Sequence, residues 1–359
     1  MSFEVNNTQF NIDINLTDSL KIKSYKNDYE VFYINKNLIN LINDIYLEND
    51  FIFIDRNVYN LDIKCLDNID SKLYYIFDAT ENNKIIDTVL EIIDILYNLN
   101  FNKKNKLIII GGGITQDVGG FIAALYKRGI SWTYIPTTFL SIVDSAIGAK
   151  VSLNHKSKNM LGVFYAPTNI YISDFFLKSL KDDDIKSGLG EALKLSLIGG
   201  DVCFNMFLEN YKDNNYINII KMASLVKKTI IEYDELENNE RKVLNYGHEF
   251  AHALEEASSY FIPHGIAVLF GMYMVNILFY KNKYSTINSL ILEIIPDKYK
   301  LLNLSYDIFI KHLLNDKKNI GNKICIILLD NVGKTIFIYK TLDEINTHMN
   351  ILFNSIFKV

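Results

Sequence analysis

The sequence predicts an α/β domain followed by a mostly α-helical domain, and three observations lead to that fold class. Short apolar runs alternate with helical patterns in the first half of the chain. One of these runs leads directly into three consecutive glycines, and from about Asp174 onward long helical patterns dominate. Alternating strands and helices are typical of a parallel sheet. We therefore assign residues 1–178 to the α/β domain and residues 179–359 to the helical domain.

The apolar runs of the first half are short and end at polar or glycine residues, as buried strands do. The expected strands cover residues 51–54, 106–110 and 132–136, and the expected helices cover residues 85–99 and 117–126. Helical spacing in the second half predicts helices at 185–197, 215–235, 248–259, 265–280 and 287–295. Weaker strand patterns return at residues 323–329 and 335–339.

Composition narrows the class of protein. The 359 residues carry a net charge of −5, which gives no sign of a nucleic-acid-binding surface. Three cysteines lie far apart, as packing residues in a reducing compartment do. The N-terminus lacks the pattern of a secretory signal, and the most apolar run, residues 266–280, is too short to span a bilayer. We expect a cytoplasmic protein that binds neither nucleic acid nor membranes.

Histidine is scarce in this chain and is concentrated in one segment. Three of the six histidines are His248, His252 and His264. A helix would place His248 and His252 on one face, because they stand four positions apart, and His264 follows a proline that could end a loop folding back over them. Imidazole is the commonest protein ligand of zinc. The cluster therefore indicates a metal site or an acid–base site.

Other segments have both a functional and a structural interpretation. The turn Gly111–Gly113 suits a dinucleotide pyrophosphate at a helix N-terminus, or a tight structural turn. Thr137 and Thr138 follow a strand and could face a crevice or cap a helix. The lysines and amides of residues 144–159 could bind an anionic substrate or form a polar surface loop.

Charged pairs in the second half are also ambiguous when read alone. Glu191 and Lys194 stand at i, i+3 on one helix face, where a surface ion pair would stabilise little. Nearby Gly188 and Gly190 disfavour that interpretation, because glycines allow close approach of another chain segment. Lys227 and Arg241 flank an acidic pair and could simply be solvated cations.

Taken together, these segments resemble the 3-dehydroquinate synthase family, within the wider group of sugar-phosphate cyclases. The resemblance runs in order from about Asp55 to Lys318. Its strongest part lies between Gly111 and Pro167, with GGGITQDVGGF, YKRG, PTT, DSAIGAK, KNMLG and FYAP. GLGEALK, Asp234-Glu235, RKVLNYGHEFAHALE and PHG follow. One departure is Ala149, which adds a methyl group where the family usually has a second glycine.

The resemblance implies a Rossmann-like α/β domain and a helical domain, with NAD and a divalent metal, usually zinc and alternatively cobalt, in the cleft between them. The metal ligands that it implies are Glu191, His248 and His264. His252 is assigned to the substrate phosphate instead, contrary to a pairing of His248 with His252 by spacing. The implied NAD-binding residues are Asp55, Asn57, Glu81, Lys84, Gly112, Gly113, Asp117, Thr137, Thr138 and Lys158.

The implied substrate is 3-deoxy-D-arabino-heptulosonate 7-phosphate, which carries an anion at each end. Lys227 and Arg241 match residues that hold its carboxylate, and Asp144 and Lys194 match groups at its hydroxyls. The phosphate pocket would contain Lys150, Asn159, Asn245 and His252, with Arg128 supplied by the neighbouring subunit of a homodimer. Lys317 matches a C-terminal active-site lysine, with Lys318 as the alternative.

The implied reaction explains these residue types. One hydroxyl is oxidised transiently, phosphate is eliminated, the hydride returns, and the opened ring closes by an aldol step, so that NAD is not consumed. The cations hold both ends of a flexible substrate in one geometry. Three alternatives stay open: a cyclase of the same group acting on another substrate such as sedoheptulose 7-phosphate, a metal-dependent polyol dehydrogenase, and an inactive binding protein.

Overall fold

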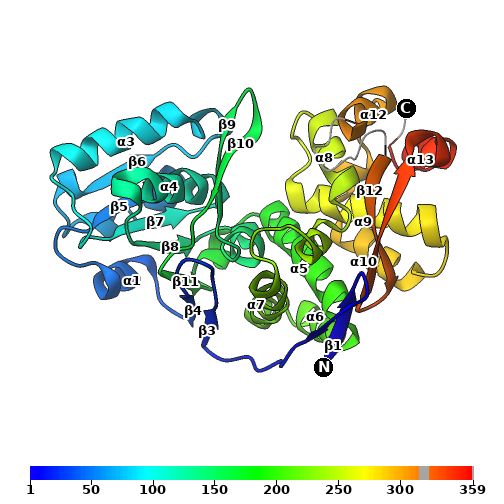
Figure 1. The fold of residues 1–359 in the computed structure, drawn as a ribbon, viewed down its shortest axis with the longest axis horizontal. Helices are drawn as coiled ribbons and strands as arrows, with labels where there is room; N and C mark the ends of the chain where they lie inside the picture. Colours follow the sequence, from blue (N-terminus) through cyan, green and yellow to red (C-terminus); the bar gives the residue numbers. More distant parts are fainter. Residues whose placement is uncertain (315–322, 358–359) are drawn as a thin grey trace. The chain divides into compact units, whose positions relative to one another are not determined.

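The computed structural model describes residues 1–314 and 323–357, which form two compact units. One unit, Leu16–Leu180, is an α/β unit, and the other combines Met1–Asn15 with Lys181–Val359 and is mostly helical (Figure 1). The expected combination of an α/β domain with a helical domain is confirmed.

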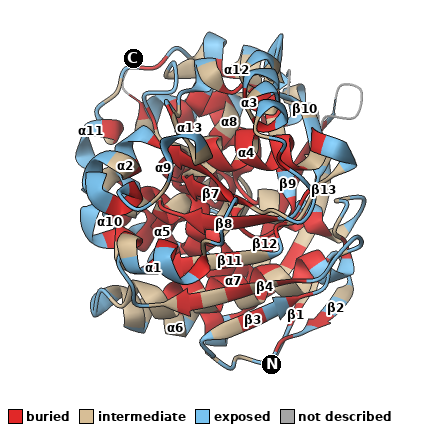
Figure 2. Ribbon diagram, turned by 90° about the vertical axis from the view of Figure 1, so that its left-hand side faces the viewer, coloured by how far each residue is buried: buried red, intermediate tan, exposed pale blue. Residues whose placement is uncertain are grey.

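A seven-stranded sheet forms the centre of the α/β unit. Its strands are β3 (Ser19–Ile22), β4 (Tyr29–Ile34), β5 (Phe51–Asp55), β6 (Tyr74–Phe77), β7 (Leu107–Gly111), β8 (Trp132–Pro136) and β11 (Asn169–Ser173). They lie in the order β3-β4-β11-β8-β7-β5-β6, and every neighbouring pair except β3–β4 is parallel. The three expected strands are confirmed as β5, β7 and β8. All their residues are buried, as in a sheet covered on both faces (Figure 2).

Helices and short turns connect these strands. The helices are α1 (Leu38–Ile45), α2 (Arg56–Leu61), α3 (Ile86–Asn98) and α4 (Gly113–Leu125). The single turns are η1 (Ile63–Leu66), η2 (Ser71–Leu73), η3 (Glu81–Asn83), η4 (Tyr126–Arg128), the π-helical η5 (Ser141–Ser145) and η6 (Phe176–Ser179). A hairpin of β9 (Lys150–His155) and β10 (Ser157–Phe164) stands apart from the sheet. The helix expected from residue 117 begins earlier, at Gly113. Glycine has a low helix propensity, so the residue pattern does not indicate that the helix starts there.

The strand order reverses at one place in this sheet. The chain passes from β5 to β6 on one side and then returns to β7 on the other side of β5. Open α/β sheets bind ligands at the carboxyl ends of the strands at such a reversal. Asp55 ends β5 and the turn Gly111–Gly113 ends β7, so both lie at that edge.

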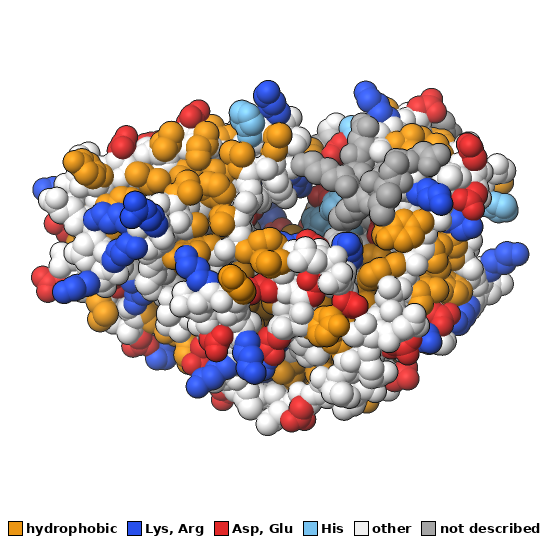
Figure 3. All heavy atoms as spheres, viewed as in Figure 1, with side chains coloured by type: hydrophobic (Ala, Val, Ile, Leu, Met, Phe, Trp, Pro, Cys, Tyr) orange, Lys and Arg blue, Asp and Glu red, His pale blue; other side chains and the backbone are white. Residues whose placement is uncertain are grey.

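The helical unit contains the five helices expected from periodicity. Its elements are α5 (Asp182–Gly199), α6 (Asp201–Lys212), α7 (Tyr216–Tyr233), η7 (Glu240–Asn245), α8 (His248–Ala257), α9 (His264–Tyr280), α10 (Ser285–Ile294), α11 (Asp297–Lys300), α12 (Tyr306–Leu314) and α13 (Leu342–Ile356). Among them, α9 is apolar on nearly every face and most of its residues are buried. No helix in the described residues is long and apolar enough to cross a bilayer. Acidic and basic side chains are interspersed over the face drawn in Figure 3.

The first fifteen residues belong to the helical unit and not to the α/β unit, which differs from the expected division after residue 178. A four-stranded sheet joins β12 (Lys323–Asn331), β13 (Lys334–Thr341), β1 (Ser2–Val5) and β2 (Thr8–Asn11). The two expected strands near the C-terminus are confirmed as β12 and β13. Pairing of β1 with β13 joins the two ends of the chain, and no local pattern predicts such a contact.

Glycines let α9 approach two other elements more closely than side chains would permit. A Cβ atom added at Gly265 would lie 1.8 Å from the carbonyl oxygen of Ser187 in α5, and one added at Gly271 would lie 1.9 Å from the carbonyl oxygen of Gly247. The backbone N–H of Gly265 also donates to Ser187 Oγ at 3.0 Å. Glu191, His248 and His264 are therefore held close together by contacts between backbones.

Replacing Gly265 with alanine tests this packing. The new methyl group would meet backbone that cannot turn away, so the free energy of unfolding should fall by about 3 kcal/mol. Gly162→Ala is the control, because its Cβ would have no neighbour closer than 3.8 Å. Urea unfolding measures both variants. Equal unfolding midpoints for the two would show that the α5–α9 contact is not tight.

Candidate functional site

Three helices bring a glutamate and two histidines together in the helical unit. Glu191 lies inside α5, while His248 and His264 are the first residues of α8 and α9. Glu191 is fully buried and His248 nearly so. The Oε1 atom of Glu191 lies 3.3 Å from His248 Nε2 and 3.4 Å from His264 Nε2. These are the three residues that the sequence predicted as metal ligands, and the structure places them in one cluster.

The spacing of these three atoms fits a tetrahedral metal ion. Ligand atoms about 2.0–2.2 Å from zinc lie about 3.3–3.6 Å apart in a tetrahedron. Both measured separations fall in that range. In addition, Oε1 of the buried Glu191 has no hydrogen-bond partner among the described residues, whereas Oε2 contacts the Lys194 ammonium. A metal ion would satisfy Oε1. The residues present therefore fit a divalent metal.

Lys194 occupies the other side of the carboxylate. Its ammonium contacts Oε2 of Glu191, and both side chains are almost completely buried. Burial alone would raise the pKa of Glu191, but the charge of Lys194 holds it well below its usual range. Glu191 is therefore ionised, and its Oε1 atom faces the two imidazoles. The predicted pair at i, i+3 is not a solvated surface ion pair.

The two histidines have different surroundings. Burial, with the nearby Lys194 ammonium, lowers the pKa of His248 to about 3, so its ring is neutral and can act as a ligand. Burial also opposes charge on His264, but Glu255 and Glu191 outweigh it and raise the pKa of His264 to about 10. In the absence of metal, a proton on His264 and the Lys194 ammonium therefore together compensate the charge of the two carboxylates. Metal binding must displace that proton.

A second group of possible ligands shares His264. His252, Glu255 and His264 also offer atoms within 4.8 Å of one another. In this group, however, Glu255 Oε2 lies 3.0 Å from His264 Nδ1, which is a hydrogen-bond distance and shorter than the separation of two zinc ligands. His252 lies beside the cluster, its ring centroid 5.5 Å from that of His248. The geometry favours Glu191, His248 and His264 as the ligands.

Two predicted carboxylate-binding residues are buried in the same unit. Lys227 in α7 is 4% exposed and Arg241 in η7 is 2% exposed, so neither is a solvated cation. The loop before Arg241 is organised by Asp234, whose carboxylate accepts from the backbone N–H groups of Asn238, Asn239 and Arg241 at 2.8–3.0 Å. Burial opposes ionisation of Asp234, yet these N–H groups lower its pKa.

Arg241 and Asn245 are held by acidic segments of the same loop. The Arg241 guanidinium donates to the carbonyl oxygen of Glu235, and Asn245 Nδ2 donates to Glu237 Oε1 at 3.3 Å. The loop thus fixes a buried guanidinium and an amide in the unit that carries the metal cluster.

In the α/β unit, several predicted NAD-binding residues lie at the carboxyl ends of neighbouring strands. Asp55 ends β5 and caps α2 by accepting from Asn57 N at 2.8 Å. Gly112 is the N-cap of α4, and Gly113 is its first residue, with no side chain capping the helix. A Cβ at Gly112 would meet the methyl group of Thr138 at 3.1 Å. This open backbone at a helix N-terminus fits a pyrophosphate.

The two threonines after β8 have structural roles in the turn that follows the strand. Thr138 Oγ1 accepts from the backbone N–H of Ser141 at 3.2 Å and donates to Ser141 Oγ at 2.9 Å, so it caps the following turn. Thr137 is buried, and its backbone N–H donates to the Gly111 carbonyl at 3.1 Å. Their binding role stays a prediction.

A polar network ties four predicted residues to the β9–β10 hairpin. The buried Lys84 pairs with Asp117 and donates to Asn159 Oδ1 at 2.6 Å. Asn154, one of the amides considered for anion binding, donates to Glu81 Oε2 at 2.7 Å and accepts from Asn159 N at 2.9 Å. Asn159, predicted for the phosphate pocket, thus lies next to residues predicted for NAD. Lys158, also predicted for NAD, is exposed on β10.

Asp144 and Lys150 flank a strained segment. Asp144 lies in the π-helical turn η5, a feature often found at functional sites. Lys150 is the exposed first residue of β9. Between them, the buried Ala149 adopts a left-handed conformation with φ 58°, which costs an alanine about 1 kcal/mol relative to glycine. The departure from the family's glycine is therefore tolerated at an energetic cost.

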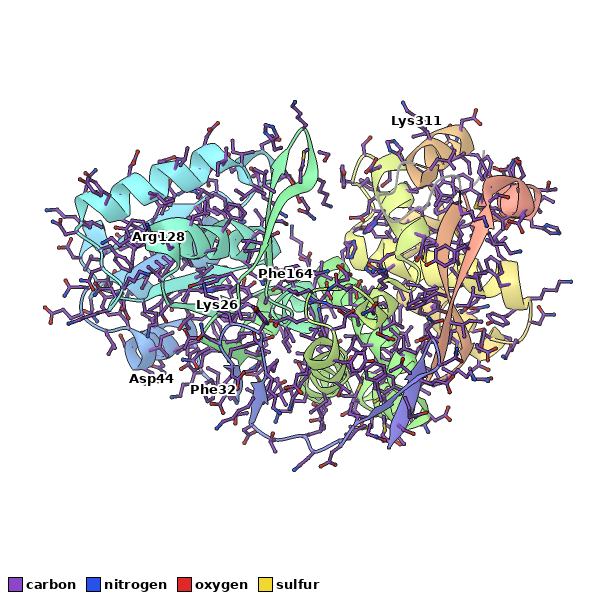
Figure 4. All side chains as sticks on the ribbon, in the orientation of Figure 1. Lys26, Phe32, Asp44, Arg128, Phe164 and Lys311 are labelled. Carbon is purple, nitrogen blue, oxygen red and sulfur yellow. The ribbon has the colours of Figure 1, made fainter. Side chains whose placement is uncertain are left out.

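Two further predicted site residues are Arg128 and Lys317. Arg128 is exposed on the α/β unit at the end of η4, with φ 65° (Figure 4). Lys317, like its alternative Lys318, lies outside the described residues. Among the described residues that the sequence reasoning missed, Glu255 could have been found from its spacing, because His248, His252 and Glu255 stand at i, i+4 and i+7 of one helix.

A buried glutamate–histidine cluster, together with a glycine turn at the reversal of a parallel sheet, defines a class of metal-dependent, nucleotide-binding enzymes. Models of the 3-dehydroquinate synthase N-terminal and C-terminal domains match residues 74–187 and 188–319. The chain belongs to the 3-dehydroquinate synthase family.

Known relatives and solved structures agree with this membership. The 3-dehydroquinate synthase of Pelagibacter ubique is 36% identical over 348 residues, which cover 89% of this chain and 94% of the relative. That of Clostridium tetani is 36% identical over 302 residues, covering 79% of this chain and 80% of the relative.

Two sugar-phosphate cyclases share the fold. A 2-deoxy-scyllo-inosose synthase in complex with carbaglucose-6-phosphate, NAD⁺ and Co²⁺ has a TM-score of 0.78 at 21% identity, covering 92% of this chain and 99% of its own. The 2-epi-5-epi-valiolone synthase of Streptomyces hygroscopicus subsp. jinggangensis with NAD⁺ and Zn²⁺ has a TM-score of 0.77 at 21% identity, covering 93% and 99%.

Two histidine variants test which triad binds the metal. His248→Ala should remove most of the metal that the purified protein retains after dialysis, because it deletes one of three ligands. His252→Ala should retain nearly the wild-type amount, because its ring is not a ligand in this geometry. Elemental analysis measures both. Loss of metal from His252→Ala but not from His248→Ala would assign the site to the other triad.

Proposed function

We propose that the protein is a 3-dehydroquinate synthase, which converts 3-deoxy-D-arabino-heptulosonate 7-phosphate to 3-dehydroquinate and phosphate with catalytic NAD and a divalent metal. The observation that carries the proposal is the burial of Lys227 and Arg241 in the unit that holds the Glu191–His248–His264 cluster. A lysine and an arginine together suit a carboxylate, which the proposed substrate carries.

The proposed cofactors are supported by the ligand atoms of the cluster and by the related proteins. One glutamate and two histidines leave an open coordination position and accept Zn²⁺ or Co²⁺. Once bound, the metal would act as a Lewis acid at substrate oxygens. NAD would accept a hydride from the substrate and later return it. Asp55, Gly112 and Gly113 would hold the dinucleotide at the carboxyl ends of β5 and β7, with Asp117 and Lys84 fixing one another beside it.

The residues of the chain would bind both ends of the substrate. Arg241 offers a planar fork that suits a carboxylate, with Lys227 as a second cation. At the other end, His252, Asn245, Lys150 and Asn159 would bind the phosphate. Holding both anions fixes a flexible sugar acid in one conformation, and this orientation is a catalytic contribution in itself.

Two groups would serve the hydroxyls between the anionic ends. Lys194 is buried against Glu191, so its ammonium lies beside the metal ligands and can donate to a substrate oxygen there. Asp144 would accept from a hydroxyl as part of the π-helical turn. We name no general base, because the substrate phosphate can itself take part in proton removal in this family.

Homodimerisation and a cytoplasmic location belong to the same proposal. Arg128 is exposed, so its guanidinium is available to reach the phosphate pocket of a second copy. The three cysteines, all in the described part of the chain, are buried and form no disulfide, as expected in a reducing compartment.

A second candidate is a cyclase acting on a sugar phosphate without a carboxylate, such as sedoheptulose 7-phosphate. The fold shared with 2-deoxy-scyllo-inosose synthase supports it. Lys227 and Arg241 argue for the heptulosonate, because a planar guanidinium with a second cation suits a carboxylate, and sedoheptulose 7-phosphate has none.

Substrate turnover separates the candidates. With NAD and Zn²⁺ or Co²⁺, the purified protein should release inorganic phosphate from 3-deoxy-D-arabino-heptulosonate 7-phosphate without accumulating NADH. Sedoheptulose 7-phosphate should be turned over far more slowly. The opposite preference would refute the proposed substrate. Net NADH formation would indicate a polyol dehydrogenase, and no turnover of either compound would indicate a binding protein.

Arg241→Ala tests the carboxylate site. A hydrogen bond to a charged group contributes about 1.5–3 kcal/mol, so KM for the heptulosonate should rise about 10- to 100-fold. Lys242→Ala removes the neighbouring exposed cation and should leave KM nearly unchanged. Steady-state kinetics gives both values. The proposed role is wrong if the two variants have the same KM.

A further inference from the structure

Glu255 makes a contact with the metal cluster that the assigned ligands do not explain. It lies on α8, two turns after His248, and is 4% exposed. Its Oε2 atom lies 3.0 Å from Nδ1 of His264, whose other nitrogen, Nε2, faces Glu191. The imidazole of His264 is therefore held between two carboxylates, one at each ring nitrogen.

The distances distinguish these two carboxylates. The 3.4 Å between His264 Nε2 and Glu191 Oε1 leaves room for an ion that both atoms ligate. The 3.0 Å between His264 Nδ1 and Glu255 Oε2 is that of a direct hydrogen bond. An ionised carboxylate can only accept, so Nδ1 must carry the proton and donate it. When metal binding displaces the second proton, the lone pair of the neutral ring lies on Nε2, which faces Glu191.

The other ligand histidine has a weaker partner. His248 Nδ1 lies 3.4 Å from the backbone carbonyl oxygen of Tyr246, which is a long contact without a formal charge. The two imidazoles therefore differ in what holds them. His264 is also the less buried of the two, with 23% of its side chain exposed against 9% for His248. A charged partner at Nδ1 would restrict the orientation of this more exposed ring.

We propose that Glu255 is a positioning residue of the metal centre, which fixes the tautomer and orientation of His264 and adds negative charge behind it. This inference rests on the proposed metal site formed by Glu191, His248 and His264. Helix α8 would then supply one ligand, His248, and orient another, His264. A metal-ligating histidine is typically held in this way by a carboxylate, and loss of the partner typically weakens metal binding about 10- to 100-fold.

Metal affinity measured without substrate tests the proposal. The affinity of the metal-free, full-length protein for Co²⁺ would be determined by competition with a chelator. Glu255→Ala should weaken it about 10- to 100-fold. Glu255→Gln keeps an oxygen that can accept from Nδ1 but removes the charge, so a smaller loss is expected. The matched control is Glu256→Gln, the next residue on α8, which is exposed and pairs with His312.

Two further readouts separate positioning from general damage to the fold. The far-ultraviolet circular dichroism spectrum of the metal-free Glu255→Gln variant should match that of the control, as expected for an intact fold. The visible spectrum of the variant, recorded at saturating Co²⁺, should differ from that of the wild type, because the geometry at His264 changes. Wild-type affinity and visible spectrum in both Glu255 variants would overturn the proposal. A wild-type protein that binds no Co²⁺ would instead overturn the metal site on which the proposal rests.

Discussion

The close contact of α9 with α5 and with the turn before α8 is the constraint on which the metal cluster depends. Gly265 touches the backbone at Ser187, and Gly271 touches the backbone at Gly247. Each contact lies within a turn or so of a cluster residue, so backbone geometry rather than flexible side chains sets the separations near 3.3 Å. Because the ligands are already in place, metal binding would cost less conformational entropy.

The charged side chains of the metal cluster are paired with one another inside the helical unit. Glu191 has Lys194 on one oxygen and two imidazoles near the other, while Glu255 faces the far nitrogen of His264. A divalent ion in the cluster would offset carboxylates that are otherwise expensive to bury. Lys227 and Arg241 are buried in the same unit, where the proposed substrate would add its carboxylate.

Periodicity predicted the main strands of the α/β unit and five helices of the other unit, because those signals are local. The pairing of β1 with β13 could not be predicted, since it joins residues at opposite ends of the chain. Spacing alone could not choose between His248 and His252, which share one face of α8; the resemblance made the choice, and the position of Glu191 supports it. The role of Asp234 could not be predicted, because it depends on backbone groups brought close only by folding, whereas spacing on α8 could have indicated Glu255.

The central claim is that one ion binds among Glu191, His248 and His264. Crystals of the zinc-loaded protein, measured on both sides of the zinc absorption edge, would locate the ion by its anomalous scattering. We expect a single strong peak about 2.0–2.2 Å from Glu191 Oε1 and from Nε2 of each histidine. A peak among His252, Glu255 and His264, or no peak in this cluster, would contradict the claim.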